Sequence, residues 1–312
     1  MDLVNAEILP SDILKGAALE NAATVLSAIG GSLNALLHLP ALAQELDIRF
    51  TWDDIAKITA KTPLLTDITP NGDKTVIELY KAGGMPALIK ELGGLIHTGC
   101  MTVTGKSIGE NVSSAEVFDR DTIRPLDNPF KTSDGIQVLY GNLATDGALV
   151  KTSAVPENLK VFKGKAVVFD NEDECYAAFK KNAVKEGDAV VIRYEGPKGG
   201  PGMKEMHRVT EIIKSIPNTA VITDGRFSGA SAGLSVGYIC PEAADGGNIA
   251  LIQNGDIIEI DLYKESINVL LTDGQLKERR ETVTVQTGNN PGGYLSRYKK
   301  SVAPSNKGAV LE

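Results

Sequence analysis

The amino-terminal part of the chain places apolar residues at helical spacing. Between Ile13 and Ile29 they recur every three or four positions, and a second apolar segment runs from Leu33 to Leu46. The Gly-Gly-Ser sequence at 30–32 separates the two segments, because adjacent glycines weaken a helix. We therefore expect two helices between residues 11 and 47.

Further helices are predicted before residue 93. Thr51 and Asp54 have the spacing of a capping box, which marks the start of a short helix. Apolar residues recur at helical spacing again over 76–92, but the Gly-Gly-Met-Pro sequence at 83–86 interrupts them. Because proline suits the first turn of a helix, we expect this stretch to form two helices.

The pattern changes in the middle of the chain. Residues 113–133 are polar and irregular, which predicts a linker and a domain boundary. Beyond them come short apolar runs typical of strands, with helical segments around 171–183 and 272–282. The expected strands lie at 136–139, 166–169, 189–194, 220–223, 234–239 and 256–262. We therefore expect a β-rich, barrel-like second domain with a few flanking helices.

The composition is that of a soluble globular protein. Of the 312 residues, 42% are hydrophobic and 23% charged. No apolar run reaches the ~18–20 residues that a membrane helix needs, and residues 1–7 lack the features of a secretory signal. A net charge of −8 argues against a nucleic-acid partner, which requires a basic face. We expect a cytoplasmic protein that binds neither membrane nor nucleic acid.

The cysteines are few and widely separated. Cys100, Cys175 and Cys240 form no C-x-x-C motif, and such an odd, sparse set indicates reduced thiols. Cys175 lies in an acidic helical segment, which would raise the pKa of its thiol. Buried or inert cysteines are therefore favoured, and an iron–sulfur cluster built from these three is the weakest alternative.

Two stretches carry the candidate chemistry. At 223–233, small residues surround Ser228 after a buried apolar run, so backbone N–H groups could approach a ligand and stabilise an anion. At 195–206, four glycines and two prolines predict a fixed loop. Glu205 ends that loop before a predicted helix, so its carboxylate could face a shared pocket. An ordinary Gly/Ser-rich turn and a carboxylate at a helix N-terminus remain the alternatives.

These stretches belong to a longer set that resembles one protein family. The matching segments lie, in chain order, at 30–35, 37–39, 61–65, 81–84, 100–111, 194–206, 223–229 and 237–247. They are similar to the dihydroxy-acid dehydratase and phosphogluconate dehydratase family of iron–sulfur dehydratases. The Thr-Asp-Gly-Arg-Phe-Ser-Gly sequence at 223–229 is most similar to members that act on branched-chain dihydroxy acids.

The resemblance implies an α/β fold and a hydro-lyase. Residues 1–125 would be the mostly helical rear part of an α/β domain, and residues 126–312 a swivelling β-barrel domain that carries the serine loop. The implied reaction, in branched-chain amino acid biosynthesis, eliminates water from a 2,3-dihydroxy acid to give a 2-keto acid. The implied substrate is 2,3-dihydroxy-3-methylbutanoate or its methylpentanoate homologue, and a sugar acid stays open.

The resemblance also implies roles for individual residues. Ser228 matches the residue that removes the C2 proton as an alkoxide, which nearby positive charge and turn amides must stabilise. Glu205 matches a ligand of the Mg²⁺ that binds the substrate, and its oxygen is the donor type that Mg²⁺ requires. Substrate contacts are implied for Gly229, Ala230, Ser32 and Asn34.

The cofactor ligands of the family are only partly matched. Its cluster cysteines, an aspartate Mg²⁺ ligand and a modified lysine precede the matched region, and no cysteine of this chain matches a cluster position. We therefore expect the carboxyl-terminal subunit of a split dehydratase, which pairs with an amino-terminal-half subunit and oligomerises through an exposed apolar face. The alternative is a non-catalytic half that binds a carboxylate ligand or a partner chain without turnover.

Overall fold

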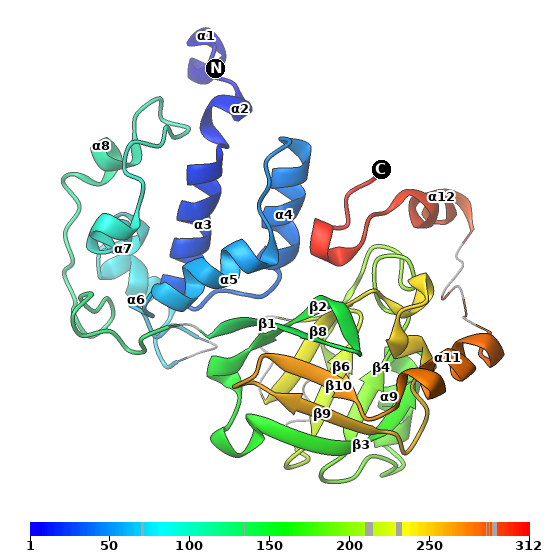
Figure 1. The fold of residues 1–312 in the computed structure, drawn as a ribbon. Helices are drawn as coiled ribbons and strands as arrows, with labels where there is room; N and C mark the ends of the chain where they lie inside the picture. The colour runs from blue at the N-terminus through cyan, green and yellow to red at the C-terminus, as the bar shows by residue number, and fades with distance from the viewer. Residues whose placement is uncertain are drawn as a thin grey trace. The chain divides into compact units, whose positions relative to one another are not determined.

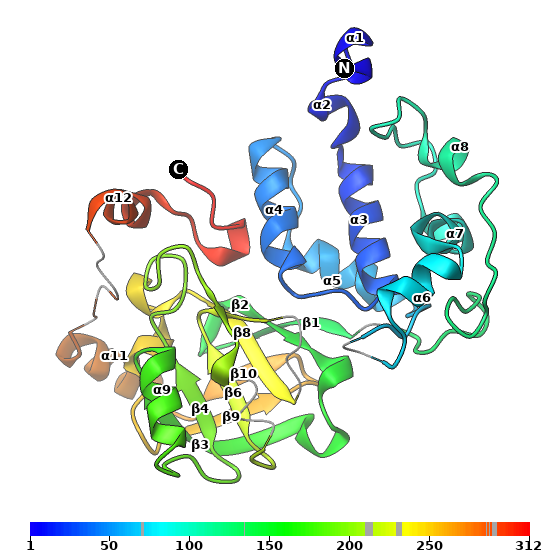
Figure 2. The ribbon, with the colours of Figure 1, turned by 180° about the vertical axis from the view of Figure 1, so that it is seen from behind.

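The chain folds into two compact units, Met1–Ile136 (unit 1) and Gln137–Glu312 (unit 2), which Figures 1 and 2 show from opposite sides. The computed structural model describes residues 1–69, 72–133, 135–209, 215–228, 233–284, 286, 288 and 292–312. Each unit is described by itself below.

Unit 1 is helical. Its helices, including one 3-10 turn, are α1 (Asp2–Asn5), α2 (Pro10–Ile13), α3 (Gly16–Ala28), α4 (Ala35–Glu45), α5 (Trp52–Lys61), α6 (Val76–Lys81), α7 (Gly84–Glu91), η1 (Gly93–Leu95) and α8 (Ile108–Val112). Helix α3 contacts both α4 and α5. A core cluster that includes Leu65, Leu88 and Ile123 packs where α6 and α7 meet the rest of the unit.

The local signals of the sequence are confirmed here. Thr51 and Asp54 form a reciprocal capping box at the start of α5. Gly83, with a φ of 121°, separates α6 from α7, and Pro86 lies in the first turn of α7. The expected helical pair appears as α3 and α4, preceded by the single turn of α2.

The irregular segment 113–133 packs onto unit 1. Ile123 is fully buried, and the Arg124 and Phe130 N–H groups donate to the carbonyls of Leu65 and Leu64, each at 2.9 Å. The irregular backbone was expected, but this segment is held by unit 1 and is not a free linker.

Unit 2 is built on a closed, mixed barrel. Within the described residues the strand order is β1-β10-β9-β3-β4-β6-β8-β2. The barrel strands are β1 (Ile136–Gly141), β2 (Ala144–Lys151), β3 (Val161–Phe169), β4 (Ala189–Ile192), β6 (Ala220–Thr223), β8 (Leu234–Cys240), β9 (Ile257–Asp261) and β10 (Ser266–Val269). Neighbours from β3 through β4 and β6 to β8 run parallel. The expected α/β class and the barrel are confirmed.

Helices and a small sheet flank the barrel. The two-stranded sheet pairs β5 (Glu205–Met206) with β7 (Arg226–Phe227). The helices of unit 2 are η2 (Thr152–Ala154), η3 (Glu157–Leu159), α9 (Glu172–Phe179), η4 (Ala243–Asp245), η5 (Asn248–Leu251), α11 (Asp273–Thr282), α12 (Gly293–Ser301) and η6 (Ser305–Lys307). The expected helices around 171–183 and 272–282 are confirmed as α9 and α11.

Both faces of the central strands are buried. Alternate residues of β4 point to opposite faces: Val191 belongs to the barrel interior, whereas Val190 packs outward with Cys175 of α9. Figure 2 shows α9 against the outer side of β3 and β4. Such strands read as continuous apolar runs, which explains why the sequence predicted them.

Several elements were missed. Asp146 and Gly147 interrupt the apolar pattern of β2, and β10 has only four residues. The two-residue strands β5 and β7 are too short for any periodic pattern. Helix α12 was also not predicted. The helix predicted after Glu205 is present at residues 208 and 209, directly after β5 and His207.

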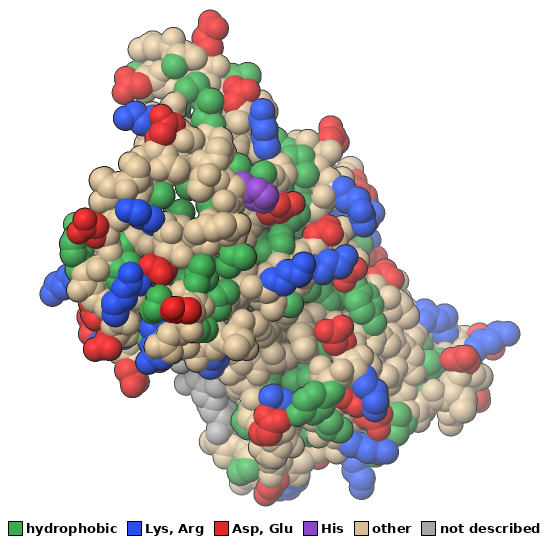
Figure 3. All heavy atoms as spheres, turned by 60° about the vertical axis from the view of Figure 1, so that its left-hand side comes forward, with side chains coloured by type: hydrophobic (Ala, Val, Ile, Leu, Met, Phe, Trp, Pro, Cys, Tyr) green, Lys and Arg blue, Asp and Glu red, His purple; other side chains and the backbone are tan. Residues whose placement is uncertain are grey.

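The length of the helices and the distribution of surface charge bear on the expected partners. Among the described residues, no helix is long and apolar enough to cross a membrane. On the side drawn in Figure 3, Lys and Arg side chains are interspersed with Asp and Glu side chains. That side therefore does not offer the single positive field that nucleic acid requires.

Thr51→Ala tests the cap of α5. Thr51 Oγ1 accepts a hydrogen bond from the Asp54 N–H (3.3 Å), and the Asp54 carboxylate accepts one from the Thr51 N–H (3.0 Å). We expect alanine to lower the free energy of unfolding by about 1 kcal/mol in urea denaturation. Thr51→Ser keeps the hydroxyl and should remain close to wild type. An alanine variant as stable as wild type would contradict the assigned cap.

Candidate functional site

The small sheet brings the two strongest candidates together. β5 and β7 run parallel, with Glu205 opposite Arg226 and Met206 opposite Phe227. The Ser228 N–H donates to the Met206 carbonyl at 3.2 Å, which extends the pairing by one residue. Ser228 therefore lies beside the strand that carries Glu205.

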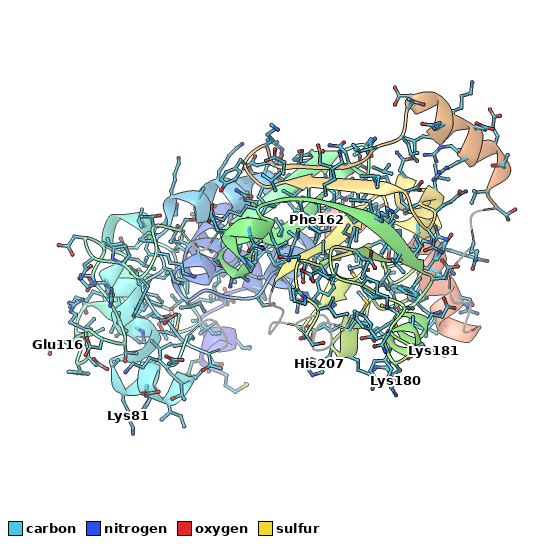
Figure 4. The ribbon with its side chains drawn as sticks, turned by 90° about the horizontal axis from the view of Figure 1, so that it is seen from below. Lys81, Glu116, Phe162, Lys180, Lys181 and His207 are labelled. Atoms are coloured by element: carbon cyan, nitrogen blue, oxygen red, sulfur yellow. The ribbon has the colours of Figure 1, made fainter. Side chains whose placement is uncertain are left out.

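His207 is the residue of this site that the sequence reasoning missed. Its Nδ1 lies 3.3 Å from Ser228 Oγ. His207 directly follows β5 and precedes the helical residues 208 and 209. Glu205 and His207 are exposed and Ser228 is half-buried. In Figure 4, His207 lies on the outside of unit 2, on the same side as Lys180 and Lys181 at the end of α9.

The residues flanking β5 are fastened to α9. Lys204 Nζ lies 3.7 Å from the carboxylates of both Glu172 and Glu195. On the other side, the Arg208 N–H donates to Glu172 Oε1 at 3.2 Å, and its guanidinium pairs with Asp173. The Arg208 guanidinium holds the pKa of Asp173 below its usual range. The acidic first turn of α9 thus binds Lys204 and Arg208, the residues on either side of the Glu205–His207 segment.

Asp224 ties three backbone segments together. It is fully buried in the turn between β6 and β7. Its carboxylate accepts hydrogen bonds from the N–H groups of Tyr194 (3.0 Å), Glu195 (3.0 Å) and Ala243 (2.9 Å). A short side chain with acceptors only suits three converging donors.

Glu242 holds the glycine-rich loop. Its two carboxylate oxygens accept the N–H groups of Lys198 and Gly199, each at 2.8 Å. A Cβ at position 199 would lie 2.6 Å from the Tyr194 Cα, so only glycine allows this approach. The loop is fixed, as the sequence predicted.

Asp224 and Glu242 are buried, where the charged form of a carboxyl group is unfavourable. Burial, together with the nearby negative charge of Asp224, raises the pKa of Glu242 to about 8. Burial also raises the pKa of Asp224 to about 6, while its three N–H donors oppose that rise. The pair therefore retains protons at a pH where exposed carboxyls have lost them.

The cysteines do not form a cluster site. Cys175 is buried beneath α9, and burial raises the pKa of its thiol to about 12, with the charge of Glu172 adding to the rise. Burial raises the pKa of Cys240 to about 11, and its Sγ lies 3.0 Å from Ser305 Oγ. In the described part of the chain, neither thiol belongs to a group of three His, Cys, Asp or Glu side chains that could hold a metal ion. The expected burial is confirmed for Cys175 and Cys240, whereas Cys100 is half-buried.

Glu205 is the metal ligand that the sequence predicts in this chain. In the part of the chain that the structure describes, no group of three His, Cys, Asp or Glu side chains could hold a metal ion. Glu205 offers one exposed hard oxygen donor, which fits a Mg²⁺ ligand but does not complete a site.

The remaining predicted residues lie elsewhere. Ser32 and Asn34 belong to unit 1, in the turn between α3 and α4, where the Asn34 N–H donates to Ser32 Oγ at 3.2 Å. Gly229 and Ala230 lie outside the described residues. The substrate contacts assigned to these residues stay predictions.

A cavity of about 840 Å³ borders the glycine-rich loop. Four carboxyl side chains line it, with Lys204 as a counter-charge: Asp170, Asp173, Glu174 and Glu195. So acidic a lining repels a carboxylate substrate. Neither Glu205 nor Ser228 lines this cavity, so we do not place the substrate there.

Matches to two family models show the class of protein. The family model Dihydroxy-acid/6-phosphogluconate dehydratase C-terminal matches residues 121–309, more than half of the chain. The corresponding N-terminal model matches residues 1–111. The chain belongs to the dihydroxy-acid/6-phosphogluconate dehydratase family.

Individual relatives narrow the similarity. The chain is 47% identical to the dihydroxy-acid dehydratase of Caldicellulosiruptor saccharolyticus over 317 aligned positions. It is 46% identical to that of Acetivibrio thermocellus and 44% identical to that of Pyrococcus abyssi. All of this chain aligns, but only 57% of each relative. The chain thus spans little more than half the length of these relatives.

The matches bear on the expected partner. Part of the family's amino-terminal domain lies within this chain, at residues 1–111. The comparisons therefore give no support for a separate amino-terminal subunit.

Glu242→Gln tests the buried carboxyl through pH. The native pKa of Glu242, about 8, lies above its ordinary value of 4.5, so between these values the native state binds a proton that the unfolded state has lost. Stability contributed by this group is complete below the lower value and is lost as pH rises through the higher one. We expect wild-type stability to fall relative to Glu242→Gln over this window, by at most ~1.4 kcal/mol per pH unit.

The measurement is urea denaturation of both proteins across that pH range. Only the difference between the two curves is used. The glutamine variant thus serves as the control for the titration of every other group. Parallel curves would show that Glu242 titrates normally and would contradict the assigned environment.

Proposed function

We propose that this protein dehydrates a 2,3-dihydroxy acid to a 2-keto acid. The observation that supports the proposal is the parallel pairing of β5 with β7. It places a half-buried serine hydroxyl beside a carboxylate-bearing strand in a chain of the dehydratase family. One group can then move a proton while the other helps to hold a cation next to the substrate.

Ser228 is proposed to accept the C2 proton. The electron pair of the broken C2–H bond forms the C2–C3 double bond, and the C3 hydroxyl leaves as hydroxide. The proton that Ser228 accepted is then given up to this hydroxide, so that water is released and the serine alkoxide is restored. The resulting enol then becomes the keto acid. Because an ordinary serine is a weak base, this step requires a serine alkoxide stabilised by positive charge nearby.

The proposed cofactors are Mg²⁺ and an iron–sulfur cluster. Of the chain's described residues, Glu205 is the one we assign to Mg²⁺, and none of its cysteines is assigned to the cluster. When bound, the two groups supply Lewis acidity at the substrate hydroxyls. Their other ligands would have to come from residues beyond those described.

The proposed substrate is a branched 2,3-dihydroxy acid such as 2,3-dihydroxy-3-methylbutanoate. The names of the relatives support this class of substrate, and the family model's own description leaves a phosphorylated sugar acid as the competitor. Comparing kcat/KM for the two acids decides between them.

We also propose that the protein acts as an oligomer in the cytoplasm. Helix α6 exposes Val76, Ile77 and Tyr80, each at least 66% accessible, which favours a covered surface in the working protein. The proposed domain division at residue 125 falls within the irregular segment 113–133.

Ser228→Ala tests the proposed reaction. Keto-acid formation is measured anaerobically with Mg²⁺, for this chain alone and for this chain mixed with a separately produced amino-terminal half of a dihydroxy-acid dehydratase. We expect wild-type activity to depend on Ser228, with alanine lowering kcat at least ~100-fold because the proton acceptor is lost. Ser266→Ala, in β10 of the same unit, is the matched control and should retain full activity.

The outcomes separate the two functional hypotheses. Activity only in the mixture would place the missing cofactor ligands on a second polypeptide. Absence of activity in both preparations, with no iron bound, would overturn the proposal in favour of a half that binds a ligand without turnover. Full activity of Ser228→Ala would overturn the role of the serine.

A further inference from the structure

His207 and Ser228 meet because of strand register. His207 follows Met206 at the end of β5, and Ser228 follows Phe227 at the end of β7. The Ser228 N–H bond to the Met206 carbonyl (3.2 Å) fixes the backbone on which this pair sits. The 3.3 Å contact between Nδ1 and Oγ thus joins two side chains whose backbones are already aligned.

With the backbone fixed, the position of Ser228 Oγ depends on the χ1 torsion. A serine hydroxyl can occupy three staggered positions about χ1, and only one points at a given neighbour. A hydrogen bond to His207 Nδ1 selects that position in either imidazole tautomer, because Nδ1 can accept from the hydroxyl or donate to its oxygen.

The residues before and after His207 are held in place. His207 lies between Met206, which is fully buried, and Arg208, whose N–H and guanidinium bind Glu172 and Asp173 of α9. The chain on both sides of the histidine is therefore anchored, although its ring is exposed.

We propose that His207 is a positioning residue that fixes the Ser228 hydroxyl in one rotamer through the contact between its Nδ1 and Oγ. The inference rests on the proposed function of Ser228 and adds a residue to it. The role requires a hydrogen-bonding atom at the place of Nδ1 and does not require an imidazole. An asparagine places an amide atom at about the same distance from its Cβ and can donate or accept there, whereas leucine can do neither.

The kinetic test compares His207→Leu with His207→Asn in the active preparation. We expect leucine to lower kcat about 10-fold, the value of one ordinary hydrogen bond, with KM unchanged. Asparagine should restore kcat to within about 3-fold of wild type. His38→Leu and His38→Asn, at an exposed position of α4 in unit 1, are the matched controls and should both keep full activity.

A second measurement does not depend on turnover. The chain contains three histidines, so their ¹⁵N resonances can be assigned by removing each in turn. The Nδ1 resonance of His207 should shift in Ser228→Ala and stay unchanged in Ser266→Ala. An unshifted resonance would overturn the contact even if the protein proves inactive.

The two tests keep separate failures apart. An inactive wild type with a shifted His207 resonance would overturn the proposed reaction and leave the contact in place. An active wild type in which His207→Leu retains kcat, or in which asparagine fails to rescue it, would overturn the positioning role while the reaction stands.

Discussion

Buried carboxylates that accept backbone N–H groups hold the site of this protein together. Asp224 receives donors from the end of β4 and from η4, and Glu242 receives two from the glycine-rich loop. Burying such charge is costly, and only several well-placed donors make it tolerable. The glycine-rich loop is therefore held next to the turn that contains Asp224 and precedes Ser228. The strand β5 emerges from that loop, so its position depends on the same carboxylates.

The short β5–β7 sheet carries the candidate residues on this fixed backbone. Two residues on each strand suffice to set Glu205, His207 and Ser228 within one small area, because parallel register dictates which residues lie side by side. The acidic first turn of α9 secures β5 from the opposite side through Lys204 and Arg208. The positions of the candidate residues thus depend on several segments of unit 2.

Much of the fold followed from the sequence. Helical periodicity and capping placed α3 to α7, and continuous apolar runs placed the doubly buried strands such as β4. Ser228 and Glu205 were predicted from their loops and from a family resemblance, and the structure sets them on neighbouring strands. His207 could not be predicted, because a two-residue strand leaves no periodic signal and its contact joins residues 21 apart in the chain. The role of Asp224 likewise depends on backbone donors that no side-chain pattern reveals.

A double-mutant cycle on Ser228→Ala and Glu205→Gln tests the central claim, that these residues act on one substrate in one site. The quantity measured is kcat/KM for keto-acid formation by the wild type, both single variants and the double variant. Groups that act as a unit are strongly non-additive, so the account predicts a double variant scarcely less active than the weaker single one. Losses that multiply would show that Glu205 and Ser228 act independently and would contradict the account.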